Sequence, residues 1–301
     1  MANNSTKIIF GVFGMIFLMF LTAVIFLIFS FKINKNEIGG LESKKSSVAV
    51  IEINGPIMKS KKTIELLHEA EKKNKYKAII IRIDSPGGAV GPTQEIFDEI
   101  VRIDKKIPVY ASFGSVAASG GYYIGAAARK IYANRGTITG SIGVIMQFMD
   151  LSELFKLSKV KPEIVKSGKF KDLGNPSRKM RKKERQLLEA SVSKVHEQFR
   201  QDIIKRRGKK IKGNLESLSQ GQIFSGQEAF EHGLVDHLGG LYTLAKNIHD
   251  ELKLEGDFRE IIFIKKPKKS KLMNILDQLE EPEAMIKRVL LNLDSPVLMF
   301  K

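Results

Sequence analysis

The hydrophobic pattern begins with a long apolar segment near the amino terminus. Residues 8–31 form 24 consecutive positions without a charged side chain. A helix of this length spans the roughly 30 Å hydrocarbon core of a bilayer. The apolar region of a cleavable signal peptide is shorter and ends at a small-residue site, which this segment lacks. We therefore predict an uncleaved membrane anchor over 8–31, preceded by a flank over 1–7 and followed by a polar linker over 32–46.

Short β-branched runs then alternate with helical stretches up to residue 133. Strands separated by helices of about a dozen residues are typical of a parallel sheet with crossover helices. The pattern therefore predicts an α/β fold. The expected strands are 48–53, 77–83, 108–112 and 130–133, and the expected helices are 61–74, 93–104 and 118–128.

A long helix is predicted after residue 179. Apolar residues recur there at intervals of three and four and form one stripe, at Leu188, Val192, Val195, Phe199 and Ile203. The folded domain is expected over 47–263. Residues 264–301 are expected to form a basic linker and a C-terminal tail. The amphipathic stretch 285–293 of that tail is a candidate contact with a partner subunit or the membrane surface.

Basic residues are concentrated in one region of the chain. The chain has 50 Lys and Arg against 33 Asp and Glu, a net charge of +17. Residues 156–212 hold 20 of the basic residues and 6 of the acidic ones, so most of the excess is regional. A basic region is typical of contact with nucleic acid or anionic lipid, and also of a solvated helix face. Because this region has only two aromatic residues, Phe170 and Phe199, and no nucleic-acid motif is present, we predict no nucleic-acid partner.

The residue types present narrow the available chemistry. The chain has no cysteine, which excludes disulfides, thiolate metal sites and a cysteine nucleophile. None of its five histidines lies in a loop setting typical of a catalytic base, and the five-residue spacing of His232 and His237 is poor for a metal. No metal or cofactor is predicted, and serine and lysine remain as candidates.

Two Gly-rich segments stand where strands are predicted to end. The sequence DSPGG over 84–88 permits a tight turn whose backbone N–H groups face outward, as in an oxyanion hole. An ordinary strand–helix turn is the alternative. The second segment, AASGGYY over 117–123, contains Ser119. This serine is either a nucleophile surrounded by small residues or the N-cap of the next helix.

A serine nucleophile needs a base, and lysine is the remaining candidate. A lysine base must lose its proton, which a desolvated site favours by lowering the lysine pKa from about 10.4. A loop-like segment over 165–174, expected to follow a strand, carries Lys166, Lys169 and Lys171. The residues alone do not select one of them.

Four motifs occur in an order that resembles a known family. DSPGG, AASGGYY, TGSIGV over 139–144 and GKFKD over 168–172 resemble signal peptide peptidase A, the membrane-anchored Ser–Lys proteases of peptidase family S49. The resemblance implies a Clp protease-like, or crotonase-like, α/β fold. It runs from about Ser47 to Leu244, and its later part includes GQIFSG over 221–226 and GLVD over 233–236. The short chain resembles single-unit members and not those with a tandem duplication.

The resemblance assigns the two catalytic roles. Ser119 matches the family's nucleophile, and Lys171, which precedes Asp172, matches the general base. Lys169 lies two residues earlier and is the competing lysine. The implied reaction is hydrolysis of peptide bonds by a membrane-bound serine endopeptidase that degrades cleaved signal peptides.

The resemblance also assigns supporting roles. Ser141 matches a serine that hydrogen-bonds the base lysine. The backbone N–H groups of Gly88 and Gly120 match the oxyanion donors, and Gly87 is a neighbouring candidate. These roles come from matched positions in the family and not from the spacing itself.

An assembly and a location are implied as well. In single-unit members the serine and lysine of one site come from neighbouring subunits, which implies a ring-shaped homo-oligomer, with an octamer as one candidate. Its cavity would admit extended peptides and exclude folded proteins. The catalytic domain is expected outside the cytoplasm at the cell membrane, although lysines that follow the anchor favour the opposite orientation. In some members the C-terminus reaches an active site, which leaves self-processing open here.

Three alternatives stay open. One is a related membrane protease that acts on other membrane or regulatory peptides. Another is a non-proteolytic enzyme of the same broad fold that processes acyl-CoA, although Ser119 together with Lys171 argues against it. The third is a membrane-tethered binding protein whose basic region contacts nucleic acid or anionic lipid.

Overall fold

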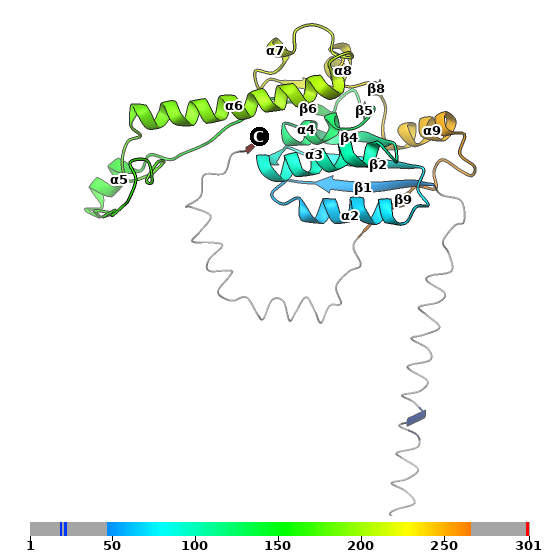
Figure 1. Cartoon of the computed structure of the whole chain (residues 1–301), viewed down its shortest axis with the longest axis horizontal. Helices are drawn as coiled ribbons and strands as arrows, with labels where there is room; N and C mark the ends of the chain where they lie inside the picture. The colour runs from blue at the N-terminus through cyan, green and yellow to red at the C-terminus, as the bar shows by residue number, and fades with distance from the viewer. Residues whose placement is uncertain (1–18, 20, 23–46, 266–298, 301) are drawn as a thin grey trace, which may run out of the picture. The chain divides into compact units, whose positions relative to one another are not determined.

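A computed structural model describes residues 47–265 together with Met19, Leu21–Thr22 and Met299–Phe300 (Figure 1). Most of the predicted anchor over 8–31, the linker over 32–46 and most of the C-terminal tail fall outside the described residues. Within the described part, no helix is long and apolar enough to cross a membrane. The anchor therefore stays a prediction from the sequence.

The element order confirms the predicted alternation of strands and helices. The first half of the domain contains β1 (Val48–Asn54), α2 (Lys61–Lys72), β2 (Ala78–Ser85), β3 (Gly88–Ala89), α3 (Val90–Asp104), β4 (Val109–Ala118), α4 (Gly120–Ala126) and β5 (Ile131–Ala133). The second half contains β6 (Ile138–Gly140), α5 (Ser152–Leu157), α6 (Lys182–Arg207), α7 (Leu215–Leu218), β7 (Ile223–Ser225), α8 (Gly226–Glu231), β8 (His237–Leu238), α9 (Leu241–Leu252) and β9 (Ile262–Phe263). A last short strand, β10 (Met299–Phe300), follows near the chain end.

The sheet within residues 47–265 has eight strands and is mostly parallel. Its main path runs β7-β6-β4-β2-β1-β9, and β5 pairs with both β4 and β8. The pairing of β6 with β7 is antiparallel, whereas β1, β2 and β4 run side by side in parallel. This confirms the predicted parallel sheet, and it brings the carboxyl ends of β2, β4 and β6 to one edge.

Alternate residues of the central strands enter two separate cores. On β1, Ala49 and Ile51 face a core shared with α2, α3, α4 and α6. Val48 and Val50 face the opposite core, which α9 covers through Leu244 and other apolar residues. Because both faces are covered, these strands read as continuous apolar runs and do not alternate with polar residues. The sheet is therefore a rigid middle layer between helices, and it fixes the loops at its edge.

Residues 144–181 form a projection that we call the arm. Figure 1 shows α5 and the start of α6 extending to one side of the sheet, away from α4 and α9. The strand predicted before residue 165 is absent, and the side chain of Val165 is 95% exposed. A β-branched run needs a pairing strand to become part of a sheet, and the arm supplies none.

Candidate active site

Three of the sequence motifs meet because their strands are parallel neighbours. Ser85 at the end of β2 lies opposite Ala117 of β4, and Ala118 lies opposite Gly140 of β6. The backbone N–H of Ser119 donates to the carbonyl of Gly140 at 2.8 Å. Ligand sites in parallel sheets lie at the carboxyl ends of strands, so this edge is the candidate site.

Ser119 occupies a strained position between β4 and α4. Its φ is +51° and its ψ −114°, although it is not a glycine, and the residue is fully buried. Strained residues of this kind cluster at functional sites, because the surrounding structure must hold them in place. The serine side chain makes no capping hydrogen bond to α4. Ser119 stands at the N-cap position of α4, but among the described residues its hydroxyl reaches only the carbonyl of Gly143, at 3.5 Å, and does not cap the helix.

Two glycines at the site are required by close backbone approach. A Cβ at Gly88 would lie 2.2 Å from the carbonyl oxygen of Ile57, and a Cβ at Gly121 would lie 2.7 Å from that of Ser85. Such contacts are too short for any side chain, so only glycine fits. Gly87, at φ +116°, completes the turn between β2 and β3. The Gly-rich motifs therefore let α4 approach the end of β2 closely and let β3 approach Ile57, which follows β1.

A bulge in β4 delivers Ser119 to this edge. Between the pairs Ile83–Phe113 and Ser85–Ala117, two positions on β2 correspond to four on β4. The Asp84 carboxylate accepts a hydrogen bond from the Val116 N–H at 3.1 Å, which holds the extra residues in place.

A second hydrogen bond fixes the same bulge. The Thr137 hydroxyl donates to the carbonyl of Gly114 at 2.8 Å. Gly114 also packs closely on Asp84, because a Cβ there would lie 2.8 Å from the carboxyl carbon. Neither Asp84 nor Thr137 has a role that the sequence predicts, although Asp84 belongs to the DSPGG motif. Only the paired strands show that the bulge exists.

The β3 edge near Ser119 pairs with a short segment from near the end of this chain. β10, the described end of the chain, pairs antiparallel with β3, with Met299 opposite Ala89 and Phe300 opposite Gly88. β3 in turn contacts α4, which starts one residue after Ser119. Pairing of a peptide with a sheet edge gives affinity through main-chain hydrogen bonds and is independent of most side chains.

Ser141 follows β6 and lies in the same region. Its φ is +48°, and its backbone N–H donates to the carbonyl of Gln222 at 2.8 Å. Gly140 precedes it with φ +76° and binds Ser119 through its carbonyl. The structure therefore places Ser141 beside Ser119, in agreement with the motif order.

The predicted lysines do not join Ser119 within one chain. Lys169 and Lys171 lie on the arm and are exposed. Within residues 47–265, Ser119 has no hydrogen bond to either ammonium group, and Lys169 Nζ instead lies 5.7 Å from the centroid of the Phe170 ring. The arm projects away from α4, as Figure 1 shows.

Histidine does not supply a base in this part of the chain either. All five histidines are described, and none forms a hydrogen bond with Ser119. His68 pairs with Glu99 at 2.8 Å, and the ring of His237 lies 4.6 Å from that of Tyr132. Within the described residues no group of three or more His, Cys, Asp or Glu is arranged to hold a metal.

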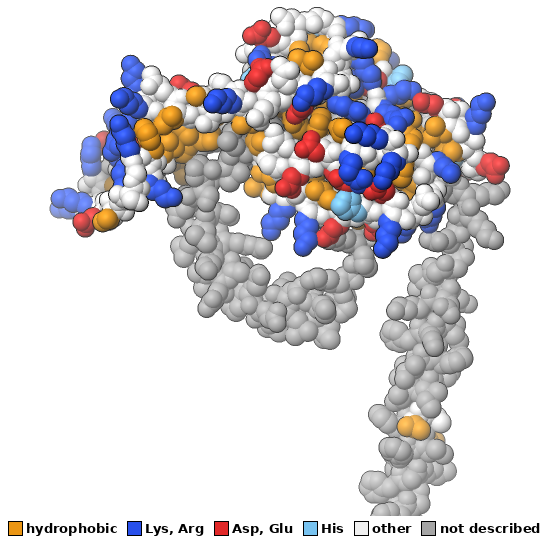
Figure 2. Space-filling view, in the orientation of Figure 1, with side chains coloured by type: hydrophobic (Ala, Val, Ile, Leu, Met, Phe, Trp, Pro, Cys, Tyr) orange, Lys and Arg blue, Asp and Glu red, His pale blue; other side chains and the backbone are white. Residues whose placement is uncertain are grey.

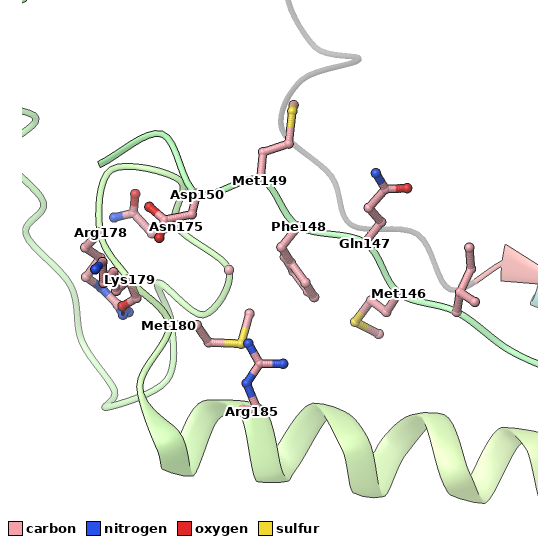
Figure 3. Close-up of a pocket in the computed structure, with 12 residues that line it drawn as sticks. Met146, Gln147, Phe148, Met149, Asp150, Asn175, Arg178, Lys179, Met180 and Arg185 are labelled. Carbon is pink, nitrogen blue, oxygen red and sulfur yellow. Dashed lines mark hydrogen bonds between the residues drawn. The ribbon is translucent and has the colours of Figure 1, made fainter. Parts of the chain in front are cut away.

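The arm carries a pocket of its own, about 630 Å³ in volume. Figure 3 shows Phe148 and Met180 directed into the same space, with Arg185 reaching in from α6. Gly174 forms part of the wall and packs directly on the Phe148 ring. A volume of this size is in the ordinary range of ligand pockets, about 300–1,000 Å³. Neither Ser119 nor Lys171 lines it, so it is separate from the serine site.

Comparison with known proteins identifies the fold and the family. The family profile of Peptidase family S49 matches residues 102–255, and that of Clp protease matches residues 43–152. Together they span both the serine edge and the arm. The structure is accordingly a Clp protease-like α/β fold.

Curated relatives agree with this assignment. A Synechocystis protein described as a candidate protease is 39% identical over 65% of this chain and 71% of its own length. The chloroplastic serine protease SPPA of Arabidopsis thaliana is 34% identical over 67% of this chain and 32% of its own length. A candidate signal peptide peptidase A of Enterococcus faecium is 34% identical over 62% of this chain and 55% of its own length. The alignments thus span about a third of the plant protein and about half of the Enterococcus protein, and the chain belongs to peptidase family S49, a family of serine peptidases.

Proposed function

We propose that this protein is a membrane-bound serine endopeptidase in which Ser119 is the nucleophile and Lys171 the general base. The observation that carries the proposal is the strained, buried Ser119 beside a strand edge that accepts an extended chain. A nucleophilic serine on a strained strand–helix turn is typical of hydrolases that form acyl-enzymes. The edge supplies the main-chain pairing that a peptide substrate needs.

The reaction follows as an acyl transfer. Neutral Lys171 takes the proton of Ser119 Oγ while Oγ forms a bond to the carbonyl carbon of the substrate. Backbone N–H groups of Gly88 and Gly120 donate hydrogen bonds to the resulting oxyanion. The C–N bond then breaks, and the lysine returns its proton to the leaving amine. Water gives a proton to the same lysine and attacks the acyl carbon. The C–Oγ bond then breaks, Ser119 Oγ takes the proton from the lysine, and the acid is released.

The proposal includes an assembly that completes the site. Because Lys171 lies on the projecting arm, we infer that the arm of one copy brings its lysine to Ser119 of a neighbouring copy. The arm has the surface such contacts require, because Leu157 is 82% and Val165 95% exposed. Its open pocket offers a second apolar contact. A closed ring of copies satisfies every such head-to-tail contact.

Location and substrate belong to the same proposal. The apolar segment over 8–31 anchors the chain, and the catalytic domain lies outside the cytoplasm. Cleaved signal peptides are the substrate class, since their apolar cores suit extended binding at a membrane. Figure 2 shows Lys and Arg side chains gathered at the end of the arm, with hydrophobic side chains between the arm and the main body of the domain. This surface combines charge with exposed apolar area and suits contact with another copy.

Separate single substitutions test the dyad. Ser119→Ala and Lys171→Ala are each expected to lower hydrolysis of an unfolded protein substrate by at least about a thousand-fold, as loss of a dyad member does in serine proteases. Lys169→Ala is the matched control and is expected to keep most of the activity. The measurement uses the detergent-solubilised full chain. Full activity of Ser119→Ala or Lys171→Ala would contradict the assignment of the dyad. Loss of activity in Lys169→Ala alone would identify Lys169 as the base.

The alternatives give different results in the same preparation. A serine-directed phosphonate is expected to label Ser119, and failure to label would favour an acyl-CoA enzyme of the same broad fold. Salt-dependent binding to DNA or acidic vesicles without peptide cleavage would favour a tethered binding protein. Mass spectrometry of peptides that accumulate in a deletion strain distinguishes signal peptides from other membrane peptides.

A further inference from the structure

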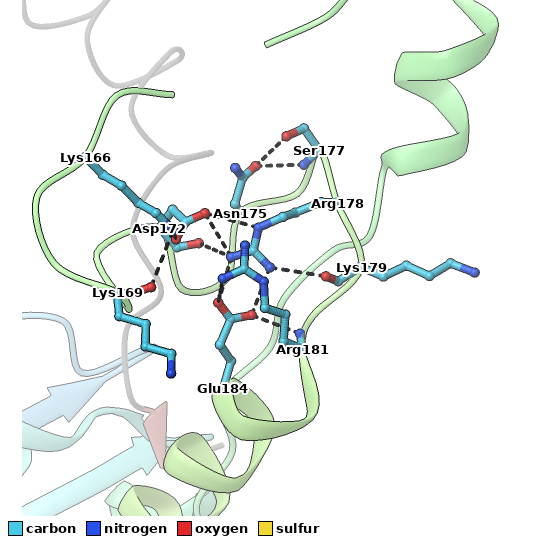
Figure 4. A network of polar contacts seen from close by, with 9 residues as sticks. All are labelled: Lys166, Lys169, Asp172, Asn175, Ser177, Arg178, Lys179, Arg181 and Glu184. Carbon is cyan, nitrogen blue, oxygen red and sulfur yellow. Dashed lines mark hydrogen bonds and ion pairs between the residues drawn. The ribbon is translucent and has the colours of Figure 1, made fainter. Parts of the chain in front are cut away.

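A network of charged groups holds the loop that carries Lys171. Arg178 lies between the Asp172 carboxylate of that loop and the Glu184 carboxylate in the first turn of α6 (Figure 4). Its guanidinium donates to both Glu184 oxygens, at 2.7 and 2.8 Å. It also donates to Asp172 Oδ2 at 2.9 and 3.1 Å. The planar fork of arginine suits such two-sided pairing, which lysine does not reproduce.

Both carboxylate oxygens of Asp172 are paired with cations. Its Oδ1 pairs with the ammonium of Lys166, and its Oδ2 pairs with Arg178. The side chain of Asp172 is only 10% exposed and that of Glu184 1%. The Lys166 ammonium and then the Arg178 guanidinium lower the pKa of Asp172 to about 2, and Arg178 likewise lowers that of Glu184 to about 2. Both carboxylates therefore stay ionised and engaged at any pH where a lysine base works.

This arrangement matters because Asp172 is the residue next to the proposed base. A carboxylate close to a lysine stabilises the protonated form, which is inactive as a base. Within the described residues, neither Lys169 nor Lys171 pairs with Asp172, whose partners are Lys166 and Arg178. Figure 4 shows the Lys169 side chain directed away from Asp172, with its carbonyl facing Lys166.

We propose that Arg178 is a positioning residue that occupies the Asp172 carboxylate and so keeps it from pairing with Lys171. The role rests on the proposed function, because it acts through Lys171. The charged groups on the loop and the start of α6 are Lys166, Lys169, Lys171, Asp172, Arg178, Lys179, Arg181, Lys182, Lys183, Glu184 and Arg185. Near Ser119, the acidic residue of the DSPGG motif is Asp84, whose carboxylate accepts a hydrogen bond from the Val116 N–H.

Loss of Arg178 is expected to raise the pH at which Lys171 becomes neutral. Without Arg178, Asp172 Oδ2 loses its partner and is free to approach Lys171, while Oδ1 keeps its pair with Lys166; a nearby cation is lost as well. Both changes favour the protonated lysine, so neutral base forms at higher pH. In Arg178→Gln we expect the acidic limb of the pH profile of kcat/KM to move up by about one pH unit, typical of a new opposite charge nearby. Activity at a pH below the limb falls about tenfold.

A double variant separates this role from simple loss of structure. Arg178→Gln combined with Asp172→Asn removes both charges, so its acidic limb is expected to return close to that of the native protein. A purely structural role predicts that the second substitution leaves the profile shifted or makes it worse. Lys179→Gln is the matched control, because Lys179 is an exposed cation on the same segment and its side chain pairs with no carboxylate in the described structure. Its limb is expected to stay in place.

The pH profiles of these variants decide whether Arg178 acts through Asp172. An unmoved limb in Arg178→Gln, or a double variant that does not return, overturns the inference. If Arg178→Gln does not assemble, the single variant Asp172→Asn is the test. Its acidic limb is expected to stay at the same pH or to move to lower pH. A move to higher pH overturns the inference. Lys171→Ala is measured alongside. If that variant stays active, the dyad fails and the inference with it, whereas an inactive Lys171→Ala with an unmoved Arg178→Gln limb defeats the inference alone.

Discussion

The backbone of Ser119 is the feature at residue scale that most clearly separates this site from an ordinary strand–helix turn. A serine at φ +51° and ψ −114° adopts a conformation that favours glycine, and the structure holds it there by the hydrogen bond from its N–H to the carbonyl of Gly140. Such strain costs of order 1–3 kcal/mol. In this conformation the hydroxyl makes no capping hydrogen bond to α4 and lies 3.5 Å from the carbonyl oxygen of Gly143.

This strain predicts a stability difference between two variants that lack the Ser119 hydroxyl. Ser119→Gly relieves it, whereas Ser119→Ala keeps it. After subtracting roughly 0.5–1 kcal/mol for the greater freedom of glycine in the unfolded chain, Ser119→Gly is expected to be more stable by about 1 kcal/mol. Chemical denaturation at equal protein concentration measures the difference. Ala127→Gly, at φ −66°, is the control and is expected to destabilise. Equal or lower stability of Ser119→Gly than Ser119→Ala would contradict the interpretation.

At the scale of elements, the bulge in β4 decides where that strained residue lies. A regular strand would place Ser119 two residues out of its present register with β2. The Asp84 carboxylate and the Thr137 hydroxyl hold the extra residues from two sides. A bulge of this kind commonly redirects a side chain beside an active site. Asp84 therefore has a function in the DSPGG motif besides the turn itself.

Asp84 supports a prediction that separates its hydrogen bond from its charge. Asp84→Asn keeps an oxygen that accepts from the Val116 N–H, so it is expected to retain activity within about threefold. Asp84→Ala leaves that N–H unpaired and loosens the bulge, which costs about 1–3 kcal/mol and lowers kcat roughly 10–100-fold. KM is expected to change less, because the β3 edge is not altered. Steady-state kinetics on both variants measures this, and equal losses in the two would mean that the charge is what matters.

The same elements show how far the sequence predicts the molecule. Parallel strands were predictable from their apolar runs, and the meeting of DSPGG with AASGGYY follows from strand ends at one edge. The bulge was not predictable from the sequence, because the register of a run such as Val109–Ala118 is defined only by its pairing with a neighbouring strand. The missing strand before Val165 has the same cause, since local β-propensity does not supply a partner. The Arg178 network joins residues whose spacing has no recognised signature.

At the scale of the whole molecule, the separation of Ser119 from Lys171 makes the proposed activity a property of the assembly. In the proposed head-to-tail ring, the arm of one copy lies on the serine edge of the next, so each site would need an intact lysine from one copy and an intact serine from the other. Two inactive variants are then complementary. In an equal, random mixture, a quarter of the sites combine both intact partners.

Co-expression of Ser119→Ala with Lys171→Ala is therefore expected to recover roughly a quarter of native activity, the fraction set by random pairing at a head-to-tail interface. The control is Ser119→Ala co-expressed with the double variant Ser119→Ala/Lys171→Ala, which contains no intact serine and is expected to stay inactive. Different affinity tags on the two copies, together with the native mass of the complex, establish that mixed oligomers form. If they form and activity does not return, the serine and lysine of each site belong to one chain, and the arm must fold back onto its own serine edge. Recovery instead assigns the arm the task of supplying the base to its neighbour, which explains why its apolar side chains are exposed and why its loop is fixed in advance by Arg178.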